Sequence, residues 1–132
     1  MKKIILILSI AFIAMSSYAQ PQKQTSNVVK AGSENGIYEL FPTENYWTFI
    51  KLDTRNGKMW QVHFTIEEDG FRGESLLNAI PLVIKEKEII GRYTLYPTEN
   101  FYNFLLLDQI DGNVFQVQWS KELENRLVVP IE

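Results

Sequence analysis

The sequence predicts an all-β fold in which two tandem repeats, each of four antiparallel strands, share one core. Residues 36–64 recur without gaps as residues 91–119, with Gly, Tyr, Leu, Pro, Thr, Glu, Asn, Phe, Asp, Gln and Val retained at equivalent positions. Short runs rich in Tyr, Phe, Trp, Ile and Val are broken by Pro, Asn, Asp and Gly about every ten residues, which is typical of antiparallel strands. Helical periodicity is absent from these runs.

Each repeat is predicted to contain a first strand, a turn, two strands joined by a hairpin loop, and a short last strand. In the third strand of repeat A, alternation places Trp60, Val62 and Phe64 on one face. Val62 on this face is expected in the core with Tyr38, Phe49 and their copies in repeat B. The strands are predicted at residues 37–41, 46–52, 59–65 and 79–83, and at residues 92–96, 101–107, 114–119 and 127–131.

Each repeat contains two turn sequences. Pro-Thr-Glu-Asn occupies residues 42–45 and 97–100, where proline presets the φ of a type I turn and asparagine tolerates a left-handed exit. Asp53 and Asp108 open hairpin loops that close at Gly57 and Gly112, where glycine accepts the positive φ of a bulge. These loops connect the second strand of each repeat with the third.

The two repeats are expected to form a single all-β domain over residues 35–132, with repeat A at residues 35–84 and repeat B at residues 89–132. One repeat of about 45 residues is marginal alone, so a shared core is required. We favour a small barrel or sandwich in which a pseudo-twofold axis relates the repeats. Two propeller-like blades are the alternative, and two blades need partner chains to close a ring.

The N-terminus predicts export. Residues 1–19 begin with Lys2 and Lys3, continue through an apolar run at residues 4–15, and end in small residues suited to cleavage after Ala19, as in a secretory signal peptide. An uncleaved membrane anchor is the alternative, but the apolar run is shorter than the roughly 20 residues that span a bilayer. Residues 20–34 are expected to be a flexible segment. We therefore expect a periplasmic or extracellular protein, with no membrane insertion after signal cleavage.

Composition argues against several classes of function. The chain has no cysteine, which excludes disulfides, thiolate metal sites and cysteine nucleophiles. Its 16 acidic residues outnumber 13 scattered basic ones, which disfavours nucleic acid and anionic lipid as partners. The single histidine, His63, leaves a metal site or a catalytic triad without its usual partners, so no metal and no other cofactor is predicted.

One hairpin resembles those of a known class of protein. Leu-Asp-Thr-Arg-Asn-Gly-Lys-Met-Trp-Gln-Val at residues 52–62 resembles the Asp-Thr-x-x-Gly-x-x-Trp hairpins of small exported bacterial β-repeat proteins, many of them uncharacterised. Repeat B departs from this pattern at Gln109, Ile110 and Phe115. The resemblance supports the fold and implies no active site.

The residues around the Pro-Thr-Glu-Asn turns are candidates for ligand binding. Aromatic rings stack on the apolar faces of sugars, while amides and carboxylates bind hydroxyl groups. The competing interpretation gives the polar residues a capping role and places the aromatic residues in the core. The candidates are Glu44, Asn45 and Trp47 in repeat A, and Glu99, Asn100 and Tyr102 in repeat B.

A second candidate is a polar sheet face formed by Gln61 and His63 in repeat A and by Gln116 and Gln118 in repeat B. It is predicted to be either an interaction surface or an ordinary solvent-exposed face. Residues 67–77, which repeat B lacks in part, are either a contact loop or an ordinary insertion.

These patterns predict an exported, non-enzymatic binding or protein-interaction module of unknown ligand, with a protein or a glycan as its partner. A small glycan-binding module that uses the two Pro-Thr-Glu-Asn turns is the alternative. A small glycoside hydrolase ranks third, with Glu44 and Glu99, or Asp53 and Asp108, as its acid and base. The aspartates already have a role in the turns, which weakens that last hypothesis.

Overall fold

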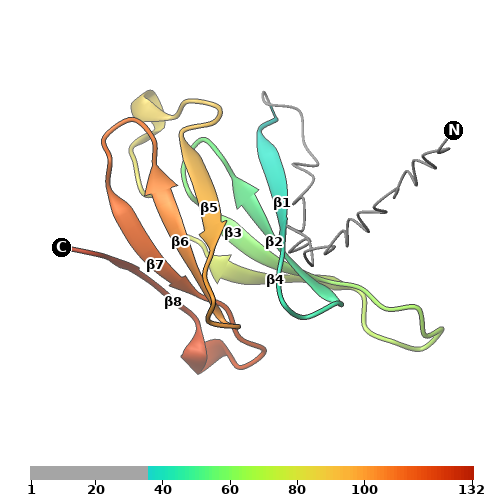
Figure 1. Ribbon diagram of the computed structural model, residues 1–132. Helices are drawn as coiled ribbons and strands as arrows, with labels where there is room; N and C mark the ends of the chain where they lie inside the picture. Colours follow the sequence, from blue (N-terminus) through green and yellow to red (C-terminus); the bar gives the residue numbers. More distant parts are fainter. Residues whose placement is uncertain (1–35) are drawn as a thin grey trace, which may run out of the picture.

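Two four-stranded antiparallel sheets make up the computed structural model, which describes residues 36–132 (Figure 1). The predictions for residues 1–19 and 20–34 lie outside the described residues. Strands adjacent in sequence are neighbours in each sheet, so the predicted all-β class with two tandem four-stranded repeats is confirmed. Sheet A contains β1 (Tyr38–Pro42), β2 (Thr48–Asp53), β3 (Met59–His63) and β4 (Gly73–Asn78). Sheet B contains β5 (Tyr93–Pro97), β6 (Asn103–Asp108), β7 (Val114–Gln118) and β8 (Leu127–Pro130).

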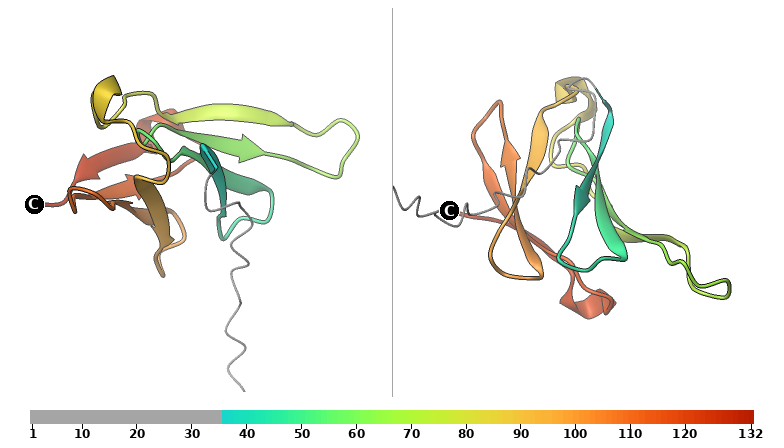
Figure 2. Two further views of the ribbon diagram at one scale, coloured as in Figure 1. Left: turned by 90° about the horizontal axis from the view of Figure 1, so that it is seen from above. Right: turned by 45° about the vertical axis from the view of Figure 1, so that its right-hand side comes forward.

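Two short 3₁₀ helices connect these strands. The first, η1 (Lys85–Lys87), joins the sheets, and the second, η2 (Leu123–Asn125), precedes β8. Figures 1 and 2 show η1 and η2 at opposite ends of the molecule, and the β3–β4 connection extends as an arm away from both sheets. Residues 36–132 contain no helix with the length and apolar character needed to cross a membrane.

The hairpin loops follow the predicted turn chemistry. Gly57 and Gly112 adopt φ values of 80° and 77°. The N–H of Gly57 donates to the carbonyl of Asp53 at 3.0 Å, and the N–H of Gly112 donates to that of Asp108 at 2.8 Å. Because a β-carbon is disfavoured at such φ values, glycine closes both loops.

The last strand of repeat A lies earlier than predicted. It was expected at residues 79–83, but β4 is Gly73–Asn78, inside the segment interpreted as an insertion. Leu76 pairs with Trp60, and the register shifts by a bulge between Met59 and Trp60. Pro81 lies beyond the strand, as expected for a residue that cannot donate to a ladder. In repeat B, Pro130 is the last residue of the edge strand β8.

One hydrophobic core joins the sheets, as predicted. Ten buried apolar side chains from both sheets form a single cluster. Sheet A and its edge contribute Ile50, Leu52, Met59 and Leu77, and sheet B contributes Tyr93, Leu95, Phe104, Leu106, Val117 and Trp119. The strands nevertheless form two separate sheets.

Sheet B turns the predicted face to this core. Tyr93, Leu95 and Val117 are buried, as their alternation indicated. The equivalent positions of sheet A are not buried: Tyr38 is 53% exposed and Leu40 is 51% exposed. The prediction that both repeats contribute the same face to the core is therefore wrong.

Sheet A meets the core with its opposite face. Ile50 pairs with Gln61 across β2 and β3, so both point to one side, and both are fully buried. Val62 is only half-buried and Phe64 is exposed, contrary to the prediction that their face of β3 is the buried one.

This packing differs from the expected pseudo-twofold arrangement. A twofold axis between two sheets brings equivalent faces together, whereas here the faces in contact are not equivalent. The sheets stack in the same sense, as successive propeller blades do.

Hydrogen bonds between the repeats accompany the core. The N–H of Tyr93 donates to the carbonyl of Thr54 at 2.8 Å. The N–H of Ser120 donates to Oε1 of the buried Gln61 at 2.8 Å. Arg126 of repeat B donates to the carbonyl of Leu76 at 2.7 Å. The repeats are thus joined by directional bonds as well as by apolar contact.

Candidate functional site

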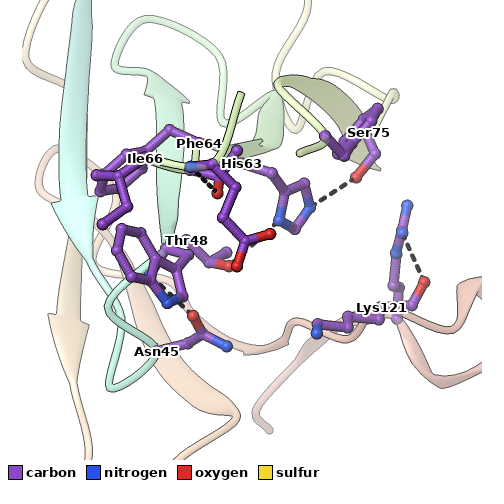
Figure 3. Close-up of a pocket in the computed structure, with 12 residues that line it drawn as sticks. Asn45, Thr48, His63, Phe64, Ile66, Ser75 and Lys121 are labelled. Atoms are coloured by element: carbon purple, nitrogen blue, oxygen red, sulfur yellow. Dashed lines mark hydrogen bonds between the residues drawn. The ribbon is translucent and has the colours of Figure 1, made fainter. Parts of the chain in front are cut away.

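Both Pro-Thr-Glu-Asn turns lie at the end of the molecule opposite the hairpin loops (Figure 1). A cleft of about 620 Å³ opens at this end between the end of sheet A and the loop that follows β7. Its aromatic lining residues are Trp47, Phe64 and Phe71. Its polar lining includes Asn45, Thr48, His63 and Ser75 from repeat A, and Lys121 and Arg126 from repeat B (Figure 3).

A second cavity of about 540 Å³ lies beside the first. Asn45 and Lys121 line both cavities, so the two form neighbouring parts of one surface. The second cavity is lined by Phe101 and Tyr102 from the turn of repeat B. Residues of both Pro-Thr-Glu-Asn turns are therefore brought together, as the glycan hypothesis requires.

The threonine and asparagine of each turn have structural roles. Thr43 Oγ1 donates to the carbonyl of Thr48 at 2.8 Å, and Asn45 Oδ1 accepts from the N–H of Trp47 at 2.9 Å. Repeat B repeats this arrangement, in which Asn100 Oδ1 accepts from the N–H of Tyr102 at 3.0 Å. These bonds are those of side chains that mimic backbone turns. The capping interpretation therefore accounts for both asparagines, and Asn45 lines the cleft in addition.

The two glutamates of the turns lie outside the cleft. Glu44 and Glu99 are exposed, and neither lines either of the two cavities. Within residues 36–132, neither carboxylate takes part in a salt bridge or a side-chain hydrogen bond. The geometry thus separates the predicted site into Asn45, Trp47 and Tyr102, which line cavities, and Asn100 and the two glutamates, which do not.

Exposed aromatic rings form the walls of the two cavities. In repeat A, Trp47 contacts Phe64 edge to face at 5.4 Å between ring centroids. In repeat B, Tyr102 lies 4.7 Å from Phe101 and 5.3 Å from Trp119. The indole of Trp119 is fixed because its Nε1–H donates to the carbonyl of Phe101 at 3.1 Å. Trp47 and Tyr102 remain about half exposed, so their rings are accessible to a ligand.

His63 lines the cleft from a half-buried position, not from a solvent-exposed face. Its Nδ1 lies 3.2 Å from Thr48 Oγ1, and its Nε2 lies 3.4 Å from Ser75 Oγ (Figure 3). Burial lowers the pKa of His63, and the positive charges of Arg126 and Lys121 lower it further. The ring is therefore neutral at pH 7 and offers one donor and one acceptor.

The predicted polar face is divided between two environments. Gln61 is fully buried between the sheets, where its Nε2 donates to Ser75 Oγ at 3.2 Å and its Oε1 accepts from Ser120. It cannot be part of an interaction surface. Its counterpart Gln116 lies on the outer side of sheet B and donates to Asn103 Oδ1 at 2.9 Å, and Gln118 is also on that side.

Several residues that line the cleft were not predicted from the sequence. Arg126 donates to the carbonyls of Ser120 at 2.8 Å and Lys121 at 3.1 Å as well as to Leu76, which holds the loop after β7 against repeat A. Only the packing of the repeats brings these basic residues to the cleft, so no sequence signal marked them. Phe71 was noted as part of the insertion, and it lines the cleft from that arm.

No group of three or more His, Asp or Glu residues in the described part of the chain is arranged to hold a metal ion. Comparisons of the chain with protein-family models, with curated proteins and with solved structures return no match.

Proposed function

We propose that the protein is an exported, non-enzymatic binding module whose ligand site is the cleft at the Pro-Thr-Glu-Asn end. One observation carries the proposal: a cleft of about 620 Å³ combines exposed aromatic rings with polar groups from both repeats. Small-molecule sites commonly have volumes of about 300–1,000 Å³ and a mainly apolar lining with a few polar groups. Export rests on the N-terminal sequence of residues 1–19.

A short glycan is the ligand class that best fits this lining. Trp47 and Phe64 offer ring surface for the apolar face of a sugar. The side-chain amide of Asn45 and the hydroxyl of Ser75 offer hydrogen-bonding groups for sugar hydroxyls, whereas both ring nitrogens of His63 already lie near Thr48 and Ser75. Lys121 lines both cavities, and Glu67 and Glu122 line one each, so the lining carries charges of both signs.

A glycan array followed by calorimetry tests the proposal. Trp47→Ala should weaken binding of any glycan retained by the wild type by at least about tenfold, or about 1.4 kcal/mol. Tyr46→Ala is the matched control, because Tyr46 is 88% exposed in the same turn and lines neither cavity. An array without binding, or equal losses in the two folded variants, would remove the proposal.

The turn glutamates distinguish this function from a glycosidase. Glu44→Gln and Glu99→Gln should leave glycan binding unchanged, because neither carboxylate lines a cavity. Chromogenic glycosides should show no turnover by the wild type. Turnover that either substitution abolishes would favour the hydrolase hypothesis instead.

A further inference from the structure

Each sheet has two faces of different character, which the repeat makes directly comparable. The aromatic face carries Tyr93, Leu95, Phe104, Leu106, Phe115 and Val117 in sheet B, and Tyr38, Leu40, Phe49, Lys51, Trp60 and Val62 at the same positions of sheet A. The glutamine face carries Phe41, Ile50, Leu52, Met59 and Gln61 in sheet A, and Tyr96, Leu105, Leu107, Val114 and Gln116 in sheet B.

Within the chain, the glutamine face of sheet A packs on the aromatic face of sheet B. Residues 36–132 leave the aromatic face of sheet A and the glutamine face of sheet B open. Apolar side chains are exposed on both: Tyr38 and Leu40 on the first, and Tyr96 at 50% and Leu105 at 38% on the second. Each open face is thus the counterpart of a face that is buried elsewhere in the same molecule.

We propose that the open aromatic face of sheet A binds the open glutamine face of sheet B in a second copy of this chain. The packing between the repeats is the template for the contact. Such a head-to-tail contact joins unlike faces, and it builds closed rings or open filaments, not symmetric dimers. The proposal does not depend on a ligand in the cleft.

Hydrogen bonds that join the repeats have counterparts across the proposed contact. Gln61 accepts from the N–H of Ser120 inside the chain, and the equivalent residues are Gln116 of one copy and Thr65 of the next. The carbonyl of Thr54 accepts from the N–H of Tyr93, and the equivalent acceptor is Gln109. Within residues 36–132, neither Oε1 of Gln116 nor the carbonyl of Gln109 accepts a hydrogen bond.

An ion pair distinguishes the open aromatic face from the buried one. Lys51 binds Glu74, whereas the equivalent positions of sheet B are Leu106 and Val128. Lys51 Nζ also lies 4.8 Å from the ring centroid of Trp60, so its charge is held over the face.

The glutamine face of sheet B has room for this side chain. Inside the chain, Leu106 Cδ2 lies 3.6 Å from the position that a β-carbon on Gly57 would occupy. By equivalence, Lys51 meets the open space at Gly112 of the next copy, where an added β-carbon would have no atom within 4 Å. The contact therefore places a lysine that is paired with Glu74 where the internal interface has a leucine.

Sedimentation velocity and light scattering on the purified protein test the proposal with two variants. Leu40→Asp damages the aromatic face of sheet A, and Leu105→Asp damages the glutamine face of sheet B. The wild type should show concentration-dependent masses above that of one chain, and each variant alone should be monomeric, with a dissociation constant raised at least about tenfold. Leu123→Asp, at a 71% exposed position in η2 on neither face, should associate like the wild type.

A mixture of the two variants gives the sharpest result. Each retains one intact face, so equal amounts should form a one-to-one heterodimer and nothing larger. A monomeric wild type at all concentrations would overturn the proposal, as would a Leu105→Asp variant that still dimerises through like faces. If either variant fails to fold, Tyr38→Asp and Tyr96→Asp form a second pair at half-exposed positions.

Restoring the apolar character of the buried face should strengthen the contact. Lys51→Leu with Glu74→Val gives sheet A the residues found in sheet B, and the assembly should tolerate more salt than the wild type. Adding Leu105→Asp to this variant should return it to the monomer. Association that persists with Leu105→Asp present would be nonspecific and would contradict the proposal.

Discussion

Asp53 and Asp108 occupy the same turn position in the two repeats, yet their arginine partners come from different places. Asp53 pairs with Arg55 of its own turn, whose side chain is about one-third exposed. Asp108 pairs with Arg92, which precedes β5 and is almost fully buried, as is Asp108 itself. The Nε of Arg92 is buried and has no hydrogen-bond partner in the described part of the chain, which offsets some of the gain from this pair.

Removing each arginine should therefore have unequal effects. Arg92→Ala leaves the Asp108 carboxylate buried without a cation, and we expect unfolding free energy to fall by about 3–5 kcal/mol. Arg55→Ala removes a partly exposed partner, and the loss should be about 1 kcal/mol or less. Urea denaturation of the two variants measures both values. Equal losses would mean that the buried pair contributes no more than the exposed one.

Acid should destabilise the protein through the same carboxylates. Burial alone would raise the pKa of Asp108, but hydrogen bonds from Arg92 and from the N–H groups of Ile110 and Asp111 outweigh it and lower the pKa. Burial would likewise raise the pKa of Asp53, but hydrogen bonds from Arg55 outweigh it and lower the pKa. A lowered folded-state pKa stabilises the fold above the unfolded pKa of about 4, and this stability is lost as pH falls through the folded value.

Urea midpoints at pH 7, 4 and 2.5 test this dependence. Stability should decline between the two lower pH values, and Arg92→Ala should decline less steeply because the Asp108 pair is already broken. A midpoint that does not change below pH 4 would contradict the assigned role of the aspartates.

Residue chemistry was predictable where it is local. The positive φ of Gly57 and Gly112 follows from the turn sequence, and so does the capping role of Asp53 and Asp108. The Arg92–Asp108 pair was not predictable, because Arg92 precedes β5, Asp108 ends β6, and the two meet only through the register of these strands.

At the scale of elements, the strands could be located from sequence more reliably than their orientation. In β2, Phe49 and Ile50 are both apolar, so alternation does not decide which face is buried. One signal was available: Lys51 occupies the position of the buried Leu106, and a lysine is rarely buried without a partner. The fourth strand of repeat A was misplaced because residues 67–77 were interpreted as an insertion, whereas the register makes Leu76 the counterpart of Pro130 in β8.

Gln61 and Gln116 provide an internal comparison of the two orientations. Gln61→Leu leaves the partly buried N–H of Ser120 without its acceptor, so we expect a loss of about 1–3 kcal/mol in unfolding free energy. Gln116→Leu, on the outer side of sheet B, should change it by about 0.5 kcal/mol or less. Thermal and urea unfolding of both variants give the comparison. A larger loss for Gln116→Leu would reverse the assigned orientation of the sheets.

At the scale of the whole molecule, the shared core was predictable because neither repeat is large enough to be stable alone. The relation between the repeats was not, because either face of sheet A is apolar enough to be buried. Stacking in one sense leaves two unlike apolar faces open and brings the Pro-Thr-Glu-Asn turns to one end. The proposed ligand site and the proposed contact between copies both follow from this arrangement.

The candidate site was predicted only in part, because some of its residues meet only when the two repeats stack. The aromatic residues and Asn45 were identified from the repeated turns, and they line the cavities. His63 was identified as a candidate, but its half-buried position in the cleft was not predicted. Lys121 and Arg126 reach the cleft only because repeat B is stacked on repeat A, which is information that no single repeat carries.

Thiol labelling of single-cysteine variants tests the stacking of unlike faces most directly. The chain has no native cysteine, so each label reports one position. The protein should be dilute, so that copies are separate. In the first pair of equivalent positions, Leu40→Cys should react rapidly and Leu95→Cys should be protected. In the second pair the order of the repeats is reversed: Ile50→Cys should be protected and Leu105→Cys should react. Equal reactivity within each pair would show that the repeats present the same face to the core, and it would contradict this account.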